Sequence, residues 1–124
     1  MAAVPHFIRV IRDHLPLAIS HAILDEWALL IGGDSWSFAT SSAWRVASPS
    51  GFEFGSGSSP TEDQIASLVG QTVVSVQSFG TAHLDPSFTL SSGMVLESFS
   101  ATDYEPWELR FTGDIFSLAD GGAA

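Results

Sequence analysis

The sequence predicts an α+β fold built mostly from short antiparallel strands, about six to eight of them, with one or two helices. Short segments rich in β-branched and aromatic residues alternate with turn residues over most of the chain, and two other segments carry helix signals. At 124 residues, 45% of them hydrophobic, the chain fits one folded domain. We expect this single globular domain over residues 1–118, followed by a flexible tail at 119–124.

The first helix is predicted at residues 6–15, where Phe7, Ile11 and Leu15 recur at helical spacing. Charged residues occupy the other side of this segment. Pro16 ends it, because the proline ring cannot continue a helix.

A second helix is predicted at residues 60–69. Ser59 can cap its first turn, and Glu62 three residues later completes a capping box. Pro60 suits the first helical position, and Gly70 provides the stop.

Residues 21–31 fit both a strand and a helix, since their apolar residues match period two and period 3.6. The two glycines and the aspartate at residues 32–34 are a turn signal. We therefore favour one strand that leads into a turn.

Residues 34–48 predict a β-hairpin. Trp36 and Phe38 alternate on one face, residues 41–42 form a plausible turn, and Trp44 resumes the alternation.

The rest of the chain is predicted to be a loop followed by strands and turns. Residues 49–59 are rich in Gly, Ser and Pro and predict a flexible connection around a short Phe-Glu-Phe segment. Residues 91–93, Ser-Ser-Gly, predict a tight hairpin turn. Four strands are expected here, at residues 72–78, 87–90, 94–100 and 107–111.

An internal duplication is one hypothesis for the organisation of the chain. The pattern Ser-Phe-x-x-Ser-Ser begins at Ser37 and again at Ser87. Half-repeats at residues 6–48 and 59–100 would then pack as a pseudo-symmetric domain. The alternative is chance identity in a serine-rich chain.

The charge balance argues against nucleic-acid and membrane partners. Four arginines and no lysine face fourteen acids, which gives a net charge of −10. Residues 46–124 carry ten of those acids and one arginine, a net of −9. Binding to a phosphate backbone or an anionic membrane requires clustered Lys and Arg, whereas a basic protein partner is compatible with this charge. The alternative is that the charge only keeps the protein soluble.

The sequence lacks the features of a secreted or membrane-spanning chain. It has no cysteine, and its longest wholly apolar run, residues 27–31, is far shorter than the roughly 20 residues of a membrane helix. Charged residues and a proline interrupt the apolar residues of the N-terminus, unlike a signal peptide. We expect a cytoplasmic protein.

Catalytic and metal-binding patterns are weak. His14 and His21 are seven residues apart, which is not the i,i+3 or i,i+4 spacing of two metal ligands on a helix, and His83 near Asp85 lies in a predicted loop. The absence of lysine and cysteine excludes Schiff-base and thiolate chemistry, and no nucleophile-elbow motif is present. We expect no catalytic residues, no metal and no cofactor.

The most distinctive candidate surface is the acidic and aromatic segment at residues 103–108. Asp103, Tyr104, Glu105 and Glu108 are predicted to contact a partner, because tyrosine offers a large contact area and carboxylates select a basic surface. The alternative is a solvated loop that leads into a core strand with Trp107 buried.

Three motifs resemble a family of small, acidic, functionally uncharacterised proteins common in actinobacteria. They are SWSFATSSAWRV at residues 35–46, LSSGMVLESFS at 90–100 and YEPWEL at 104–109. The resemblance covers residues 23–118, and its motifs are structural rather than catalytic. It implies no activity, but some similar proteins resemble immunity proteins that neutralise toxins.

Together these observations predict a non-enzymatic protein-binding domain, most concretely an immunity-type inhibitor of a basic toxin. Two alternatives remain open: a structural subunit of a larger assembly, and a hydrolase with a His and acid site.

Overall fold

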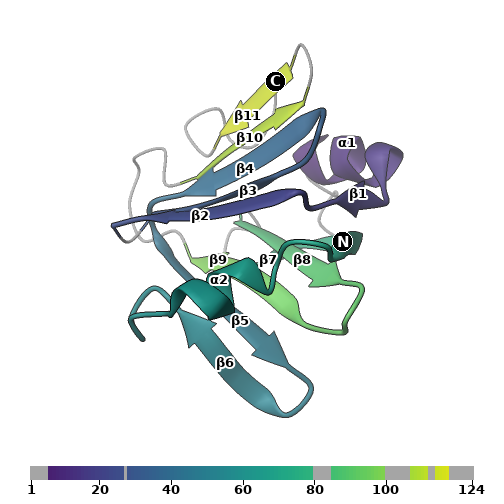
Figure 1. Cartoon of the computed structure of the whole chain (residues 1–124). Helices are drawn as coiled ribbons and strands as arrows, with labels where there is room; N and C mark the ends of the chain where they lie inside the picture. The colour runs from purple at the N-terminus through teal and green to yellow at the C-terminus, as the bar shows by residue number, and fades with distance from the viewer. Residues whose placement is uncertain (1–5, 27, 80–84, 100–106, 112–113, 118–124) are drawn as a thin grey trace.

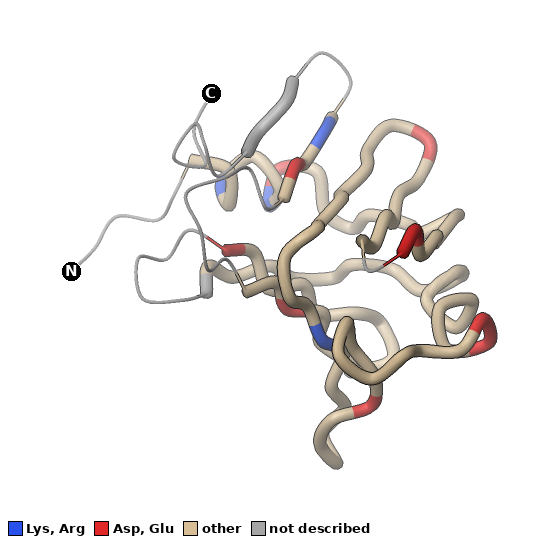
Figure 2. The backbone as a smooth tube through the Cα atoms, turned by 90° about the vertical axis from the view of Figure 1, so that its left-hand side faces the viewer, with Lys and Arg blue, Asp and Glu red and all other residues tan. Residues whose placement is uncertain are grey.

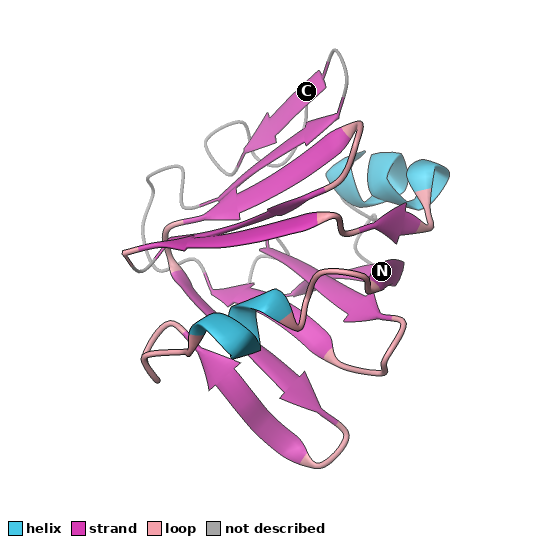
Figure 3. Cartoon of the chain, in the orientation of Figure 1, coloured by secondary structure: helices cyan, strands magenta, loops and turns pink. Residues whose placement is uncertain are grey.

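A computed structural model describes residues 6–26, 28–79, 85–99, 107–111 and 114–117. Its described part contains eleven strands in two antiparallel sheets and two helices, which confirms the predicted α+β class. The two sheets lie above one another in Figure 1, and Figure 3 shows how far strands outweigh helices.

The first sheet has six strands in the order β1-β7-β8-β9-β5-β6. Their bounds are β1 Leu17–Ala18, β7 Thr72–Phe79, β8 Asp85–Leu90, β9 Val95–Phe99, β5 Ala43–Ser48 and β6 Gly51–Gly55.

The second sheet has five strands in the order β11-β10-β4-β3-β2. Their bounds are β11 Asp114–Ser117, β10 Trp107–Phe111, β4 Trp36–Thr40, β3 Ala28–Gly32 and β2 His21–Asp25. On β10, Trp107, Leu109 and Phe111 are buried and Arg110 is exposed, so the strand buries one face and exposes the other.

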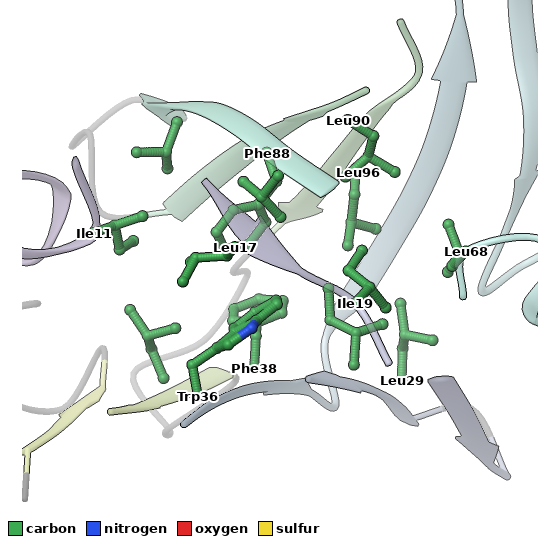
Figure 4. Close-up of a cluster of buried hydrophobic side chains, with 14 of the residues drawn as sticks. Ile11, Leu17, Ile19, Leu29, Trp36, Phe38, Leu68, Phe88, Leu90 and Leu96 are labelled. Carbon is green, nitrogen blue, oxygen red and sulfur yellow. The ribbon is translucent and has the colours of Figure 1, made fainter. Parts of the chain in front are cut away.

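The core lies between the two sheets. Phe38 on β4 and Phe88 on β8 meet across it, edge to face, with ring centroids 4.9 Å apart. The buried side chains of Figure 4 come from both sheets and both helical regions. Fully buried aliphatic and aromatic groups of this kind supply most of the folding free energy.

Helix α1, His6–His14, joins the two sheets at one side of the core. Phe7, Ile8 and Ile11 are completely buried, and the Phe7 ring lies 5.0 Å from that of Trp107 on β10. The Arg12 guanidinium of the same helix donates to the Val76 carbonyl of β7, in the first sheet, at 3.3 Å. The predicted helix and its end before Pro16 are confirmed.

Helix α2, Glu62–Ala66, is shorter than predicted and begins two residues later. Its cap is Thr61, whose hydroxyl accepts from the Gln64 amide while the Gln64 side chain accepts from the Thr61 amide. The predicted cap, Ser59, instead has a positive φ of 51°. The predicted cap is wrong because Ser59 and Thr61, two residues suited to capping, lie two positions apart. The capping box forms between Thr61 and Gln64 rather than between Ser59 and Glu62.

Residues 34–48 form the two predicted strands, but the predicted hairpin is wrong. β4 pairs with β3 and β10, whereas β5 pairs with β6 and β9 in the other sheet. A two-residue hairpin turn needs residues that accept positive φ, which Ser41-Ser42 does not offer. The chain instead crosses between sheets, where the hydroxyls of Thr40, Ser42 and Ser98 lie within 3.2 Å of one another.

The single strand predicted over residues 21–31 is two strands. β2 and β3 form a hairpin in which Asp25 pairs with Ala28, and Glu26 takes a positive φ of 56° between them. The sequence has no glycine or asparagine at this turn, so the usual signal for a hairpin turn was absent and the turn was not predicted.

The predicted loop at residues 49–59 is partly a strand. β6 pairs with β5, and a bulge places the extra residue Glu53 between Phe52 and Phe54. The short strands β1 and β11 were also not predicted.

The two strings of the proposed duplication form different structures. The second lies in the predicted hairpin of β8 and β9, whose turn contains Gly93 at a φ of 91°. The first, at β4 and β5, crosses between the sheets. The sequence offset therefore does not correspond to a repeated hairpin.

Candidate functional site

The predicted acidic and aromatic surface is only partly described. Asp103, Tyr104 and Glu105 lie outside the described residues. Glu108 is on β10, where its carboxylate accepts from the Arg110 guanidinium at 2.6 Å and its side chain is 34% exposed. Trp107 beside it is buried in the core.

The described histidines do not gather into a metal-binding group. His14 stacks on the Phe111 ring with centroids 4.4 Å apart, and His21 lies on β2. Asp85 is buried at the start of β8, whereas His83, its proposed partner, lies outside the described residues. Within the described ranges, no group of three or more metal-ligating side chains comes together.

The structure reveals a groove that sequence reasoning missed, between β2 and α2. It has a volume of about 380 Å³. In Figure 1, β2 is the front edge of the upper sheet and α2 lies beneath it. The residues that line the groove are Ala22, Ile23, Leu24, Pro60, Thr61, Glu62, Ile65, Ala66 and Val69.

Apolar side chains dominate this β2/α2 groove. Ile23 is 51% exposed and Val69 is 44% exposed, although both are large aliphatic residues. Ala22 and Leu24 point to the other side of the strand from Ile23 and pack partly against the core. Exposed aliphatic groups that line a concavity are typical of a binding surface.

Acidic side chains border the groove. Glu62 lines it, and Asp63 follows on the first turn of α2. Asp25 and Glu26 continue the chain directly after the strand residues of the groove, and all four acids are exposed. None of the described residues that line the groove is basic.

The described arginines elsewhere are mostly engaged. Arg45 on β5 pairs with Glu97 at 2.9 Å, Arg110 pairs with Glu108, and Arg12 bonds to a carbonyl of β7. The excess of acidic over basic positions is visible along the tube in Figure 2. The groove therefore lies in a negative field that its own chain does not neutralise.

No local sequence signal locates the groove. Ile23 and Val69 both line it, but their proximity depends on the placement of α2 beside β2. That placement is a long-range contact that no local pattern encodes.

No helix in the described ranges has the length and apolar character needed to cross a membrane. Comparisons with family models, with curated proteins and with solved structures gave no match for this chain.

Proposed function

We propose that this protein is a non-enzymatic protein-binding domain that captures a basic partner, most concretely an immunity-type inhibitor of a basic toxin. The observation that carries the proposal is the apolar β2/α2 groove with its border of exposed acids. Apolar contact in a concavity provides affinity, and the acids select and steer a positively charged partner.

Inhibition would follow from charge and shape. A toxin that acts on nucleic acid or another anionic substrate carries Lys and Arg around its active site. A protein with a net charge of −10 that covers this region opposes substrate binding electrostatically.

Asp103, Tyr104 and Glu105 stay proposed contacts. Glu108 contributes less free charge, because Arg110 already neutralises it.

The test is a pull-down from the native host with the tagged full chain, washed at about 0.1 M and about 0.5 M salt, which differ roughly twofold in screening length. We expect one basic protein to be retained at low salt and weakened at high salt. Its activity in isolation should be inhibited by an equimolar amount of this chain.

Charge reversal locates the contact. Glu62→Lys should reduce retention, because it places a cation in the groove. The matched control is Glu53→Lys, which changes another exposed acid, on β6 in the other sheet, and should retain the partner. Retention of no basic protein, or equal loss with both variants, contradicts the proposal.

A second candidate function is a structural subunit of a larger assembly. Phe52 on β6 is 60% exposed and Val74 on β7 is 47% exposed, and both belong to the six-stranded sheet. Exposed groups of this size often contact other subunits. A complex that survives about 0.5 M salt and dissociates with Phe52→Ser favours this candidate over the inhibitor. The hydrolase with His83 and Asp85 has no supporting observation in the described residues.

A further inference from the structure

We infer that the partner binds by strand addition: an extended basic segment pairs with the free edge of β2 and places aliphatic side chains in the β2/α2 groove. This inference rests on the proposed function and names the partner's binding mode and chemistry. It depends on the hydrogen-bonding pattern of β2, on the walls of the groove and on its charge.

The register of the second sheet fixes which groups of β2 point outward. Asp25 and Ala28 flank a two-residue loop and therefore form a hydrogen-bonded closing pair. Because such pairs alternate along antiparallel strands, Ile23 and His21 are also hydrogen-bonded to β3. The amides and carbonyls of Ala22 and Leu24 then point away from the sheet.

An independent contact supports this assignment. The Gly33 amide donates to the Trp36 carbonyl at 2.9 Å, so Gly33 forms a hydrogen-bonded pair on the β4 side of β3. Alternation then directs Gly32 and Leu30 toward β2, which agrees with the pattern read from the β2–β3 turn.

The outward groups of β2 have no backbone partner among the described residues. β2 is the last strand of its sheet. Among the described residues, no backbone hydrogen bond joins Ala22 or Leu24 to α2 or to a loop. Edge strands are usually blunted by proline, by inward charges or by cover from another element. Here α2 lies beside the edge and forms a groove along it, instead of occupying its hydrogen-bonding groups.

The groove determines what an added strand would carry. Residues of an extended segment alternate between two faces, and those on the core side would lie over Ile65 and Val69. Aliphatic side chains fit this wall. The residues between them would lie near Asp25 and Glu62, which favour Lys or Arg. A second copy of this chain is disfavoured as occupant, because both copies carry a net charge of −10.

The probe is a synthetic peptide of about seven residues, the length of a common strand, in which Lys alternates with Val. Binding to the full chain is measured by fluorescence anisotropy at low salt. We expect saturable binding that weakens as salt rises, and no binding by the same peptide with Glu in place of Lys. N-methylation of the peptide amides keeps its side chains but removes its donors, and should weaken binding about tenfold or more.

Two further measurements locate the contact. Ala22→Pro removes an outward amide at an edge position where proline is tolerated, and should weaken binding of the Lys/Val peptide about tenfold. Amide hydrogen exchange should slow at Ala22 and Leu24 when the peptide is added. Equal binding of the N-methylated peptide, or slowed exchange confined to β6 or β11, would overturn strand addition on β2.

The failure of this inference differs from failure of the proposed function. If the basic host protein binds the Ala22→Pro chain as tightly as the unchanged chain, strand addition is wrong and the inhibitor proposal stands. If the peptide binds at β2 but no basic host protein is retained, strand addition stands and the inhibitor proposal is wrong. Sedimentation that shows a dimer lost with Ala22→Pro would assign the edge to a second copy and overturn the basic partner.

Discussion

At the scale of single residues, a hydrogen bond from Trp36 joins the two sheets. Its indole nitrogen donates to the Ala18 carbonyl of β1 at 3.0 Å, which ties β4 of the second sheet to the edge of the first. Gly33 permits this approach, because a Cβ there would lie 2.6 Å from the Trp36 indole nitrogen and would also meet the Ala18 carbonyl.

We predict that Gly33→Ala lowers the free energy of unfolding by about 2 to 3 kcal/mol, through steric overlap and loss of the indole hydrogen bond. Urea denaturation followed by tryptophan fluorescence measures it. The matched control is Gly57→Ala, where an added Cβ meets no atom within 4 Å. Its unfolding free energy should stay within about 0.5 kcal/mol of the unchanged chain. Equal effects of the two substitutions would show that the close approach does not matter.

At the scale of elements, two residues near the start of α2, Ser59 and Thr61, could cap the helix, and the structure uses Thr61. Thr61→Ala removes the hydroxyl that accepts from the Gln64 amide and should lower the free energy of unfolding by about 1 kcal/mol. Ser59→Ala should have a smaller effect, because the Ser59 hydroxyl does not cap the helix. Thermal denaturation of the two variants, followed by circular dichroism, tests this. A larger loss from Ser59→Ala would restore the cap predicted from sequence.

Local patterns predicted the elements better than their pairing. The period of α1, the alternation on β10 and the glycine turn between β8 and β9 are all short-range signals, and the structure has each of them. The prediction of a β4–β5 hairpin was wrong because alternation shows that two strands exist, but not whether they share a sheet. The turn at Glu26 was not predicted because its residue with positive φ is not glycine.

The candidate site was less predictable than the fold for the same reason. The sequence itself shows a strongly negative chain, with ten acids and one arginine in residues 46–124. The groove, however, depends on Ile65 and Val69 lying beside β2, about 40 residues away in sequence, which is a tertiary contact. Composition gives the net charge of the chain, but not the position of the groove on its surface.

At the scale of the whole molecule, the net charge opposes folding. The fourteen acids outnumber the four arginines, and their mutual repulsion exceeds what the ion pairs Arg45–Glu97 and Arg110–Glu108 can offset. Exposed pairs of this kind contribute about 0 to 1 kcal/mol each.

We therefore predict that the melting temperature rises by a few degrees between about 0.02 M and about 0.5 M sodium chloride, because salt screens this repulsion. Thermal denaturation followed by circular dichroism measures the change. The gain should be smaller for Glu53→Lys, which reduces the net negative charge by two without touching the core. A melting temperature that falls with salt would mean that favourable ion pairs outweigh the repulsion.

The crossing from β4 to β5 has a consequence for folding during synthesis. These strands are neighbours in sequence, yet β5 pairs with β9, which is translated about 50 residues later, and β4 pairs with β10, which is translated about 70 residues later. A nascent chain that has emerged only as far as α2 exposes the inner strands of both sheets with unpaired edges. The order of translation thus leaves this apolar chain open to aggregation or chaperone binding until its final third is available.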